Sequence, residues 1–288
     1  MKRLIFDEDH EMFRDSVRRF MQAEVAPHVE QWRKDGRCDP EVFLKAGEQG
    51  LLCMWADEQY GGLGIEDFRF EQVVIEETIR HGDIGLFMTL HSRLVGPYIG
   101  HLGSETLKSR LLPKCISGET ILAVAMTEAG AGSDISGIKS KAVRDGADWV
   151  LNGSKTYISN GIISGAIVVA ARTVPDKPHG LGLFVVEDGM PGFSRGRNLA
   201  KMGLKTQDTA ELFFENVRIP AENVLGDPER GFYSLMHYLA EERLISACQE
   251  VAHAQVAFDL TMDYILERKA FGKPIGAFQN SRFKMAEM

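Results

Sequence analysis

Residues 123–134 read Ala-Val-Ala-Met-Thr-Glu-Ala-Gly-Ala-Gly-Ser-Asp, and no other stretch of the chain is as informative. An apolar, strand-like run leads there into a hydroxyl, a carboxylate and two glycines. The glycines allow backbone amides to approach a ligand closely, because no side chain stands in the way. The hydroxyls of Thr127 and Ser133 can donate hydrogen bonds to a flat polar ring system or accept them from it. We therefore expect a ligand-binding loop here.

A second stretch, residues 156–161, reads Thr-Tyr-Ile-Ser-Asn-Gly. Tyr157 precedes Ser159 by two positions, and in a strand two side chains at that spacing point to the same face. An aromatic ring and a hydroxyl on one face predict a wall against which an aromatic cofactor can lie.

Together, these residues resemble the flavin-binding signature of the acyl-CoA dehydrogenase family. Two later stretches fit the same family in the right order and at the right distances. They are Lys201-Met-Gly-Leu-Lys-Thr-Gln-Asp-Thr-Ala-Glu-Leu-Phe-Phe-Glu215 and Glu267-Arg-Lys-Ala-Phe-Gly-Lys273. The resemblance covers essentially all 288 residues, and it is strongest to the long-chain branch of the family.

Composition excludes several other classes of protein. A net charge of −8 argues against a nucleic-acid partner, which calls for a basic patch. No apolar run reaches the ~18 residues that a membrane span needs. The charged start at residues 7–11 gives no sign of a signal peptide. The four cysteines, Cys38, Cys53, Cys115 and Cys248, have no metal-binding spacing, so we expect no metal and reduced thiols in a cytoplasmic protein.

Hydrophobic periodicity divides the chain into three parts. Helical spacing dominates residues 1–120. Within this part we expect helices over residues 12–25, from Asp39-Pro40 onward, over 67–80, and over 106–112, the last one closed before Pro113. Residues 121–228 read as strands and predict a small β-barrel or sandwich domain. Residues 229–288 return to a helical period, with one long helix from Gly231 towards Tyr264 and a second helix over 283–288.

The expected strands lie over 166–174, 181–186 and 210–214. Residues 148–158 predict a hairpin with Asn152-Gly153 as the turn at its tip. The fold class is therefore α+β multidomain: an N-terminal helical domain, a middle β-barrel domain and a C-terminal helical bundle. The resembling family has this three-part architecture. Its members are commonly longer, so we expect the C-terminal bundle to be incomplete in this chain, which would then be a truncated form or an inactive fragment.

Oxidation beside a thioester needs a base for the α-proton and an acceptor for the β-hydride. No side chain accepts hydride, so a cofactor must do so. A desolvated carboxylate with a raised pKa makes a suitable base. The resemblance assigns this role to Glu242, which directly precedes Arg243, as in the isovaleryl and long-chain types. The alternative is that Glu241 and Glu242 lie on a solvated helix face. Glu241 points some ~100° away from Glu242 around the helix.

The resemblance also implies the binding residues. FAD would be contacted by one loop, by the second stretch and, from a neighbouring subunit, by C-terminal residues. These are Val124, Ala125, Met126, Thr127, Glu128, Ala129, Gly130, Ala131, Gly132 and Ser133; Tyr157, Ile158 and Ser159; and Arg268, Phe271 and Gln279. The acyl-CoA path would be lined by Ser133, Pro178, His179, Tyr233, Ala240, Glu241 and Arg243. The neighbour's contribution implies a homo-oligomer, a dimer or tetramer. Pro178-His179-Gly180 can also be an ordinary turn, and Arg243 and Arg268 can be surface charges.

Four positions depart from the family pattern. Ala129 replaces the usual proline, Tyr157 the commoner tryptophan, Ser159 the commoner threonine, and Ala240 an aspartate or proline. Tyr157 and Ser159 keep the ring and the hydroxyl, whereas Ala240 leaves one CoA contact in doubt.

The resemblance predicts FAD-dependent oxidation of an acyl-CoA, of long or branched chain, to a trans-2-enoyl-CoA. Glu242 would be the base, and an electron-transfer flavoprotein would receive the electrons. The alternatives are a flavin oxidase or monooxygenase on the same fold, and a non-catalytic flavoprotein that binds a partner.

Overall fold

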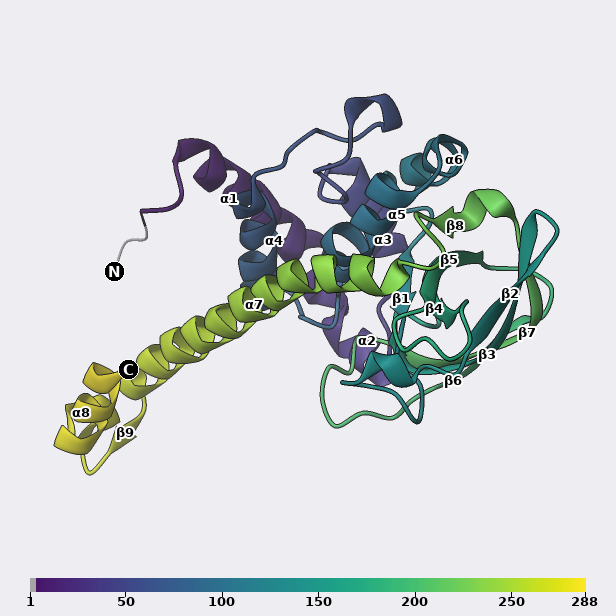
Figure 1. Ribbon diagram of the computed structural model, residues 1–288. Coiled ribbons are helices and arrows are strands. Elements are labelled where there is room, and N and C mark those ends of the chain that lie inside the picture. The colour runs from purple at the N-terminus through teal and green to yellow at the C-terminus, as the bar shows by residue number, and fades with distance from the viewer. Residues whose placement is uncertain (1–3) are drawn as a thin grey trace.

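The computed structural model describes residues 4–288 and arranges them as helices, then strands, then helices (Figure 1). The N-terminal helices end at Ile116, the strands of the middle part run from Leu122 to Leu225, and a helix that begins at Gly231 dominates the rest. This order confirms the predicted α+β class. The boundaries predicted at 120/121 and 228/229 fall in the two connections between these parts.

The helices of the N-terminal part pack around two apolar clusters, of which one is shared with the sheet and α7. The α-helices are α1 Glu8–Phe20, α2 Val29–Asp35, α3 Glu41–Glu48, α4 Phe68–His81, α5 Gly96–Leu102 and α6 Glu105–Ile116. Two π-helical segments, η1 Met21–Val25 and η4 Leu90–Val95, and two 3-10 turns, η2 Ala26–His28 and η3 Glu58–Tyr60, join them. The periodicity predicted over 12–25 is confirmed, because Val17, Met21 and Val25 are fully buried.

Helix α6 corrects one prediction. The helix does not close before Pro113 but continues through it to Ile116. Proline removes one hydrogen-bond donor and destabilises a helix interior. Here the following turn still forms, because the Ser117 N–H donates to the Pro113 carbonyl at 3.0 Å and Leu112 and Cys115 are buried on either side.

The middle part is one eight-stranded sheet that curls around its own core. Its strands are β1 Leu122–Ala125, β2 Lys141–Asp145, β3 Asp148–Ser159, β4 Ala166–Arg172, β5 Leu181–Glu187, β6 Phe193–Asn198, β7 Thr209–Ile219 and β8 Val224–Leu225. The order is β6-β7-β3-β2-β4-β5-β8, and β1 pairs in parallel with β4. The rings of Trp149 in β3 and Phe184 in β5 lie 5.4 Å apart between centroids although two strands separate them, so the sheet closes around them as a barrel does.

The hairpin predicted with Asn152-Gly153 at its tip is wrong. β3 runs unbroken from Asp148 to Ser159, and its hairpin partner is β2, with the turn at Gly146. Asn152 instead lies opposite a bulge in β7, where Glu215 and Asn216 face this one residue of β3, and Gly153 pairs with Phe214. The Asn152 side chain accepts a hydrogen bond from the Asn216 N–H at 2.8 Å, which holds the bulge in the sheet. A Cβ on Gly153 would lie 2.3 Å from the hydroxyl of Ser140, so only glycine fits there.

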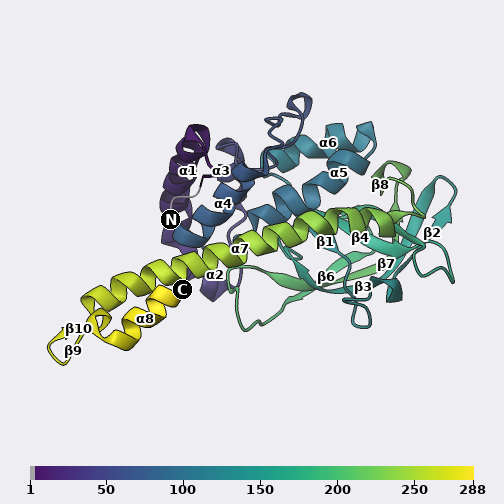
Figure 2. The ribbon, with the colours of Figure 1, turned by 60° about the vertical axis from the view of Figure 1, so that its left-hand side comes forward.

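The C-terminal part begins with α7, Gly231–Glu267, which lies against α4 and η4 and then extends beyond them (Figure 2). A small hairpin, β9 Lys269–Ala270 and β10 Lys273–Pro274, and a 3-10 turn, η7 Ile275–Ala277, lead into α8, Gln279–Glu287. The second C-terminal helix therefore starts earlier than residue 283. In the far half of α7, Val251, Leu260 and Tyr264 are exposed.

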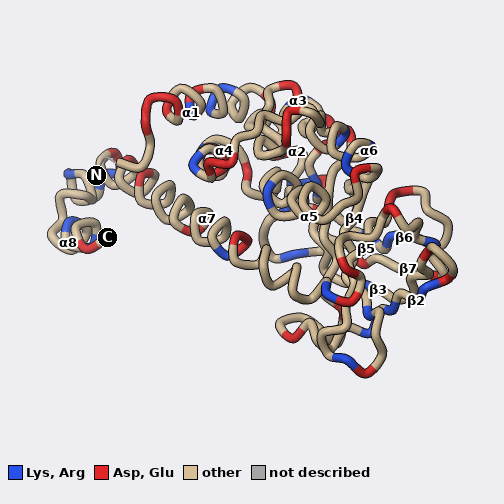
Figure 3. Tube along the Cα trace, turned by 45° about the horizontal axis from the view of Figure 1, so that its top comes forward, with Lys and Arg blue, Asp and Glu red and all other residues tan. Residues whose placement is uncertain are grey.

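Positive and negative side chains are mixed along the chain. Lys and Arg alternate with Asp and Glu along most of the trace (Figure 3). In residues 4–288 no helix combines the length and the apolar character that a membrane crossing requires.

Candidate active site

The loop that follows β1 forms a tight turn with one open side. The backbones of Glu128 and Ala131 exchange two hydrogen bonds, of 2.8 Å and 3.1 Å. A Cβ added to Gly130 or Gly132 would meet no atom within 4 Å, so space is open beside both. Among the described residues, the hydroxyls of Thr127 and Ser133 have no hydrogen-bond partner. The loop thus offers polar groups and accessible backbone to a ligand.

Tyr157 stands beside this loop in a strained conformation. Its φ is +59°, a left-handed value that is unfavourable for an aromatic residue and that often marks a functional site. The cause is an irregular register between Lys155 and Ile158 where β3 pairs with β7. Ile158 enters the core, whereas the Tyr157 side chain is 69% exposed. The Thr156 N–H donates to the Thr127 carbonyl at 3.0 Å, so the two predicted stretches are direct neighbours.

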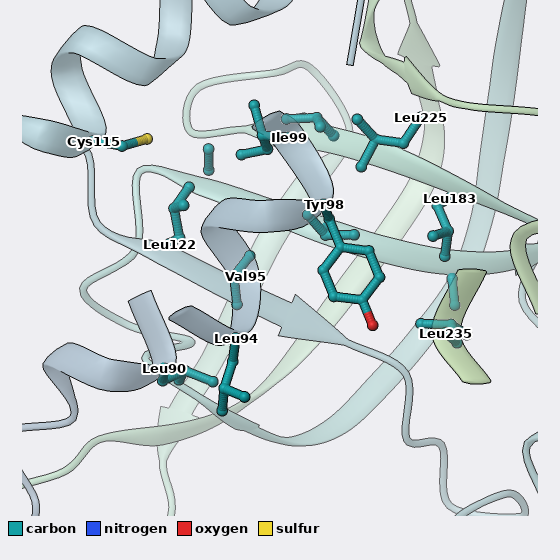
Figure 4. Packing of buried hydrophobic residues seen from close by; sticks show 14 of the residues in the cluster. Leu90, Leu94, Val95, Tyr98, Ile99, Cys115, Leu122, Leu183, Leu225 and Leu235 are labelled. Carbon is teal, nitrogen blue, oxygen red and sulfur yellow. The ribbon is translucent and has the colours of Figure 1, made fainter. Parts of the chain in front are cut away.

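Glu242 lies in the N-terminal half of α7 and is half-buried. Burial raises the pKa of its carboxyl group, and the charge of Arg243 opposes that shift. The buried Tyr98 of α5 lies close enough for Glu242 to help burial raise the pKa of the phenol. Figure 4 shows the Tyr98 ring between the η4–α5 segment and Leu235 of α7. A carboxyl group that is partly desolvated beside apolar side chains has the character of a general base.

The neighbouring Glu241 has a different environment. It forms an ion pair with Arg93 of η4, which ties α7 to the N-terminal helices. Behind this pair lies Glu71 of α4, whose side chain is almost completely buried. Burial raises the pKa of Glu71 to about 7, the Thr89 hydroxyl and Arg93 lower it, and Glu241 raises it further. Sequence reasoning missed Glu71 and Arg93, because neither carries a local signal of burial.

Three of the predicted acyl-CoA residues, Pro178, His179 and Tyr233, lie together at the start of α7. The His179 ring stacks on Phe232, with 4.0 Å between centroids and 14° between planes, and Tyr233 lies 6.0 Å away. A surface pocket opens between the turn at residues 177–180 and Tyr233. Arg172 donates to the carbonyls of Ser136 and Ile138, at 2.6 Å and 3.1 Å. Arg172 thereby joins the segment after Ser133 to the end of β4.

Comparison with known proteins decides the family. Residues 7–119, 123–217 and 229–288 match the models of the acyl-CoA dehydrogenase N-terminal, middle and C-terminal domains. The chain belongs to the acyl-CoA dehydrogenase family. It is similar to the long-chain specific acyl-CoA dehydrogenase of Sus scrofa mitochondria, with 46% identity over 99% of this chain and 67% of that protein. The isovaleryl-CoA dehydrogenase of Solanum tuberosum mitochondria is 39% identical over 99% of this chain and 70% of its own length.

Solved structures agree. The crystal structure of an acyl-CoA dehydrogenase from Geobacillus kaustophilus superposes with a TM-score of 0.96 and 46% identity, over 99% of this chain and 76% of that one. A glutaryl-CoA dehydrogenase from Mycobacterium smegmatis, solved in complex with FADH2, gives 0.89 and 30%, over 98% and 72%. Like its family, this acyl-CoA dehydrogenase is an FAD-dependent oxidoreductase of acyl-CoA thioesters.

The residues at the β1 loop fit a flavin. The free hydroxyls of Thr127 and Ser159 and the open space beside Gly130 and Gly132 suit a flat ring with polar edges. The exposed ring of Tyr157 supplies a face on which such a system can lie.

Three predicted FAD residues lie elsewhere in this acyl-CoA dehydrogenase. Arg268 and Phe271 belong to the β9–β10 hairpin region and Gln279 begins α8, at the far end of α7 from the sheet (Figure 2). Phe271 is 94% exposed. One chain therefore does not bring these residues to its own β1 loop. Ala240 and Arg243 lie exposed on α7 near Glu242.

Within residues 4–288, no three His, Cys, Asp or Glu side chains are grouped as a metal site would require. The four cysteines are free thiols, and burial raises the pKa of Cys38 to about 12.

Proposed function

We propose that this acyl-CoA dehydrogenase oxidises a long-chain or branched acyl-CoA to the trans-2-enoyl-CoA, with Glu242 as the catalytic base. One observation carries the assignment: Glu242 is a half-buried carboxyl group with a raised pKa, at the position directly before Arg243. A base whose pKa is moved towards neutrality removes a weakly acidic α-proton more readily than an exposed glutamate does. The similarity to long-chain and isovaleryl enzymes supports the substrate class.

Bound FAD supplies the hydride acceptor, which no side chain can provide. The protein's part is to bind, orient and exclude water. In the proposal, residues 124–133, Tyr157 and Ser159 hold the flavin ring, with the Thr127 and Ser159 hydroxyls at its polar edge. Tyr98 and Leu235 form an apolar surface near Glu242, and such a surface keeps the carboxyl group desolvated until substrate arrives.

The CoA part of the substrate would lie along Ser133, Pro178, His179, Tyr233, Ala240 and Arg243. The stacked rings of His179 and Phe232 offer a flat surface, and Arg243 an exposed guanidinium group for a phosphate. Glu241 is engaged by Arg93, so its proposed role here is to fix the turn of α7 beside the substrate.

Assembly and partners follow the same reasoning. The distance of Arg268, Phe271 and Gln279 from the β1 loop of their own chain supports a homo-oligomer, a dimer or tetramer, in which they reach a neighbour's FAD. We propose an electron-transfer flavoprotein as the electron acceptor. The proposed compartment is the cytoplasm, where the free thiols stay reduced, although the relatives from pig and potato are mitochondrial by name. Cell fractionation would decide between the two.

The test is an anaerobic titration of the FAD-loaded protein with saturated acyl-CoAs of graded length and branching. We expect the flavin absorbance to bleach near one equivalent, most readily with long or branched chains. Bleaching by short chains alone would overturn the substrate class. Bound FAD that no acyl-CoA bleaches would indicate a non-catalytic flavoprotein, and reduced flavin that air reoxidises at once would indicate an oxidase.

A further inference from the structure

Lys155 is a charged residue in an interior position. It lies on β3, and its side chain is 0% exposed. Lysine is almost never fully buried unless it is paired. The Lys155 ammonium group donates to the Glu128 carboxylate at 2.8 Å and to the Met126 carbonyl at 2.9 Å. Burial lowers the pKa of Lys155 to about 8, while Glu128 opposes this shift. Both acceptors belong to the segment that follows β1, which is the proposed flavin loop.

Glu128 is the centre of a larger connection. Its side chain is 9% exposed and points to Lys155. Its carboxylate also accepts hydrogen bonds from the N–H groups of Lys139 and Ser140, at 2.7 Å and 3.0 Å. Burial raises its pKa, but the hydrogen bond and charge of Lys155 and the backbone donors together hold the pKa below its ordinary value. One ionised side chain thus joins the loop, β3 and the residues that enter β2.

These contacts define the shape of the loop on its open side. Next to the Lys155–Glu128 pair, the Thr156 N–H bonds to the Thr127 carbonyl, and the Glu128 and Ala131 backbones bond to each other. All of these bonds join the loop to itself or to β3, while the space beside Gly130 and Gly132 is open. The loop is therefore held by groups that do not include its ligand. A site formed in advance binds more tightly than one that must be ordered on binding.

We propose that Lys155 is a positioning residue of the flavin site, which acts through Glu128 to fix the 126–133 loop against β3. The inference rests on the flavin site proposed above. In this role Glu128 serves the flavin indirectly, through the shape of the loop, and Lys155 is a further functional residue. A buried pair whose partners are removed singly leaves an uncompensated charge, whereas replacing both partners together is far better tolerated.

The test compares three variants with one control. Lys155→Met removes the ammonium group and keeps an unbranched side chain of similar length. Glu128→Gln removes the negative charge and keeps one carbonyl oxygen, which can accept from only one of the two backbone donors, because Lys139 and Ser140 donate to different carboxylate oxygens. The double variant contains no charge at either position. Lys141→Met, on the neighbouring strand β2, is the control, because Lys141 is exposed. For each protein, FAD is removed and added back, the dissociation constant is measured from flavin fluorescence, and the thermal midpoint of the apoprotein is recorded.

We expect each single variant to raise the FAD dissociation constant at least tenfold, and the control to stay within twofold. Because both residues act as one unit, the double variant should bind no more weakly than the weaker single variant. The visible circular dichroism of the bound flavin should change in the variants and not in the control. A lower thermal midpoint with an unchanged FAD dissociation constant would overturn the proposal. So would a double variant whose dissociation constant rises by the product of the two single-variant factors, because the two residues would then act independently. If Lys155→Met does not fold, Glu128→Gln decides: tenfold weakening supports the inference and a constant within twofold overturns it. Failure of the parent to bind FAD would instead refute the proposed site itself.

Discussion

The buried carboxyl group of Glu71 should make the stability of this protein depend on pH in a defined direction. Its pKa rises from the ordinary 4.5 to about 7 in the folded chain. Well below pH 4.5 the Glu71 carboxyl group is neutral in both the folded and the unfolded state, so it does not lower the free energy of unfolding. As the pH rises towards 7, the unfolded state ionises first, so the free energy of unfolding falls by about 1.36 kcal/mol per pH unit. Above pH 7 both states are ionised and the loss is constant.

Glu71→Gln removes this dependence while keeping the size of the side chain and its contact with Thr89. From the pKa values, the ionised carboxylate costs roughly 1 kcal/mol at pH 5 and on the order of 3 kcal/mol at pH 8.5. The advantage of the Gln variant over the parent should therefore grow by about 2 to 3 kcal/mol between these two pH values. Any difference between Gln and the protonated carboxyl group itself cancels in this comparison.

Urea unfolding of both proteins at pH 5 and pH 8.5, followed by circular dichroism, measures the effect. Glu119→Gln is the matched control, because it removes a carboxylate from an exposed position; its effect should change by less than about 0.5 kcal/mol. If the Glu71→Gln advantage stays constant between the two pH values, Glu71 is not the titrating group described here, and the account of the Glu71–Arg93–Glu241 cluster is wrong.

Three further predictions concern the wall of the site, the barrel core and the base. Tyr157→Gly removes an exposed ring but relieves a left-handed φ. The free energy of unfolding should therefore change by less than about 1 kcal/mol, while FAD should bind more weakly. A loss of more than about 2 kcal/mol, measured by urea unfolding, would contradict this. Phe184→Ala empties the fully buried centre of the barrel beside Trp149 and should cost about 3 to 5 kcal/mol; a cost below about 1 kcal/mol would show that the sheet does not close around this ring. Finally, kcat should rise with pH as Glu242 ionises, with a midpoint above the ordinary glutamate value of 4.5; a profile that is flat from pH 4.5 to pH 8 would argue against a titrating base.

Local patterns are sufficient to predict the order of the elements and to single out the two stretches of the proposed flavin site, which are neighbours in the structure. The 3.6-residue period identified the helix over 12–25, and the apolar runs identified β4 and β5. The stretches around Thr127 and Tyr157 were predicted to form one site, and a direct backbone hydrogen bond joins them. These features depend on residues close together in the chain, where spacing carries the information.

The predictions that failed depend on contacts between distant parts of the chain. Asn152-Gly153 is a typical hairpin turn by itself, but pairing with β7 keeps both residues inside β3, opposite a bulge in β7. Pro113 is a typical helix stop, but burial of its neighbours carries α6 past it. The sequence around Lys155 and Glu71 does not predict their burial, because lysine and glutamate are usually exposed.

Rapid mixing of the Glu242→Gln variant with substrate tests whether Glu242 takes the α-proton. The FAD-loaded variant would be mixed anaerobically with the best acyl-CoA substrate of the parent, and the bleaching of the flavin followed in time. Glu250→Gln serves as the control, because Glu250 is an exposed carboxylate on the same helix. We expect Glu242→Gln to retain FAD with the affinity of the parent and to bleach about 10² to 10⁴ times more slowly, while the control keeps the parental rate. Bleaching of Glu242→Gln at close to the parental rate would show that Glu242 is not the base.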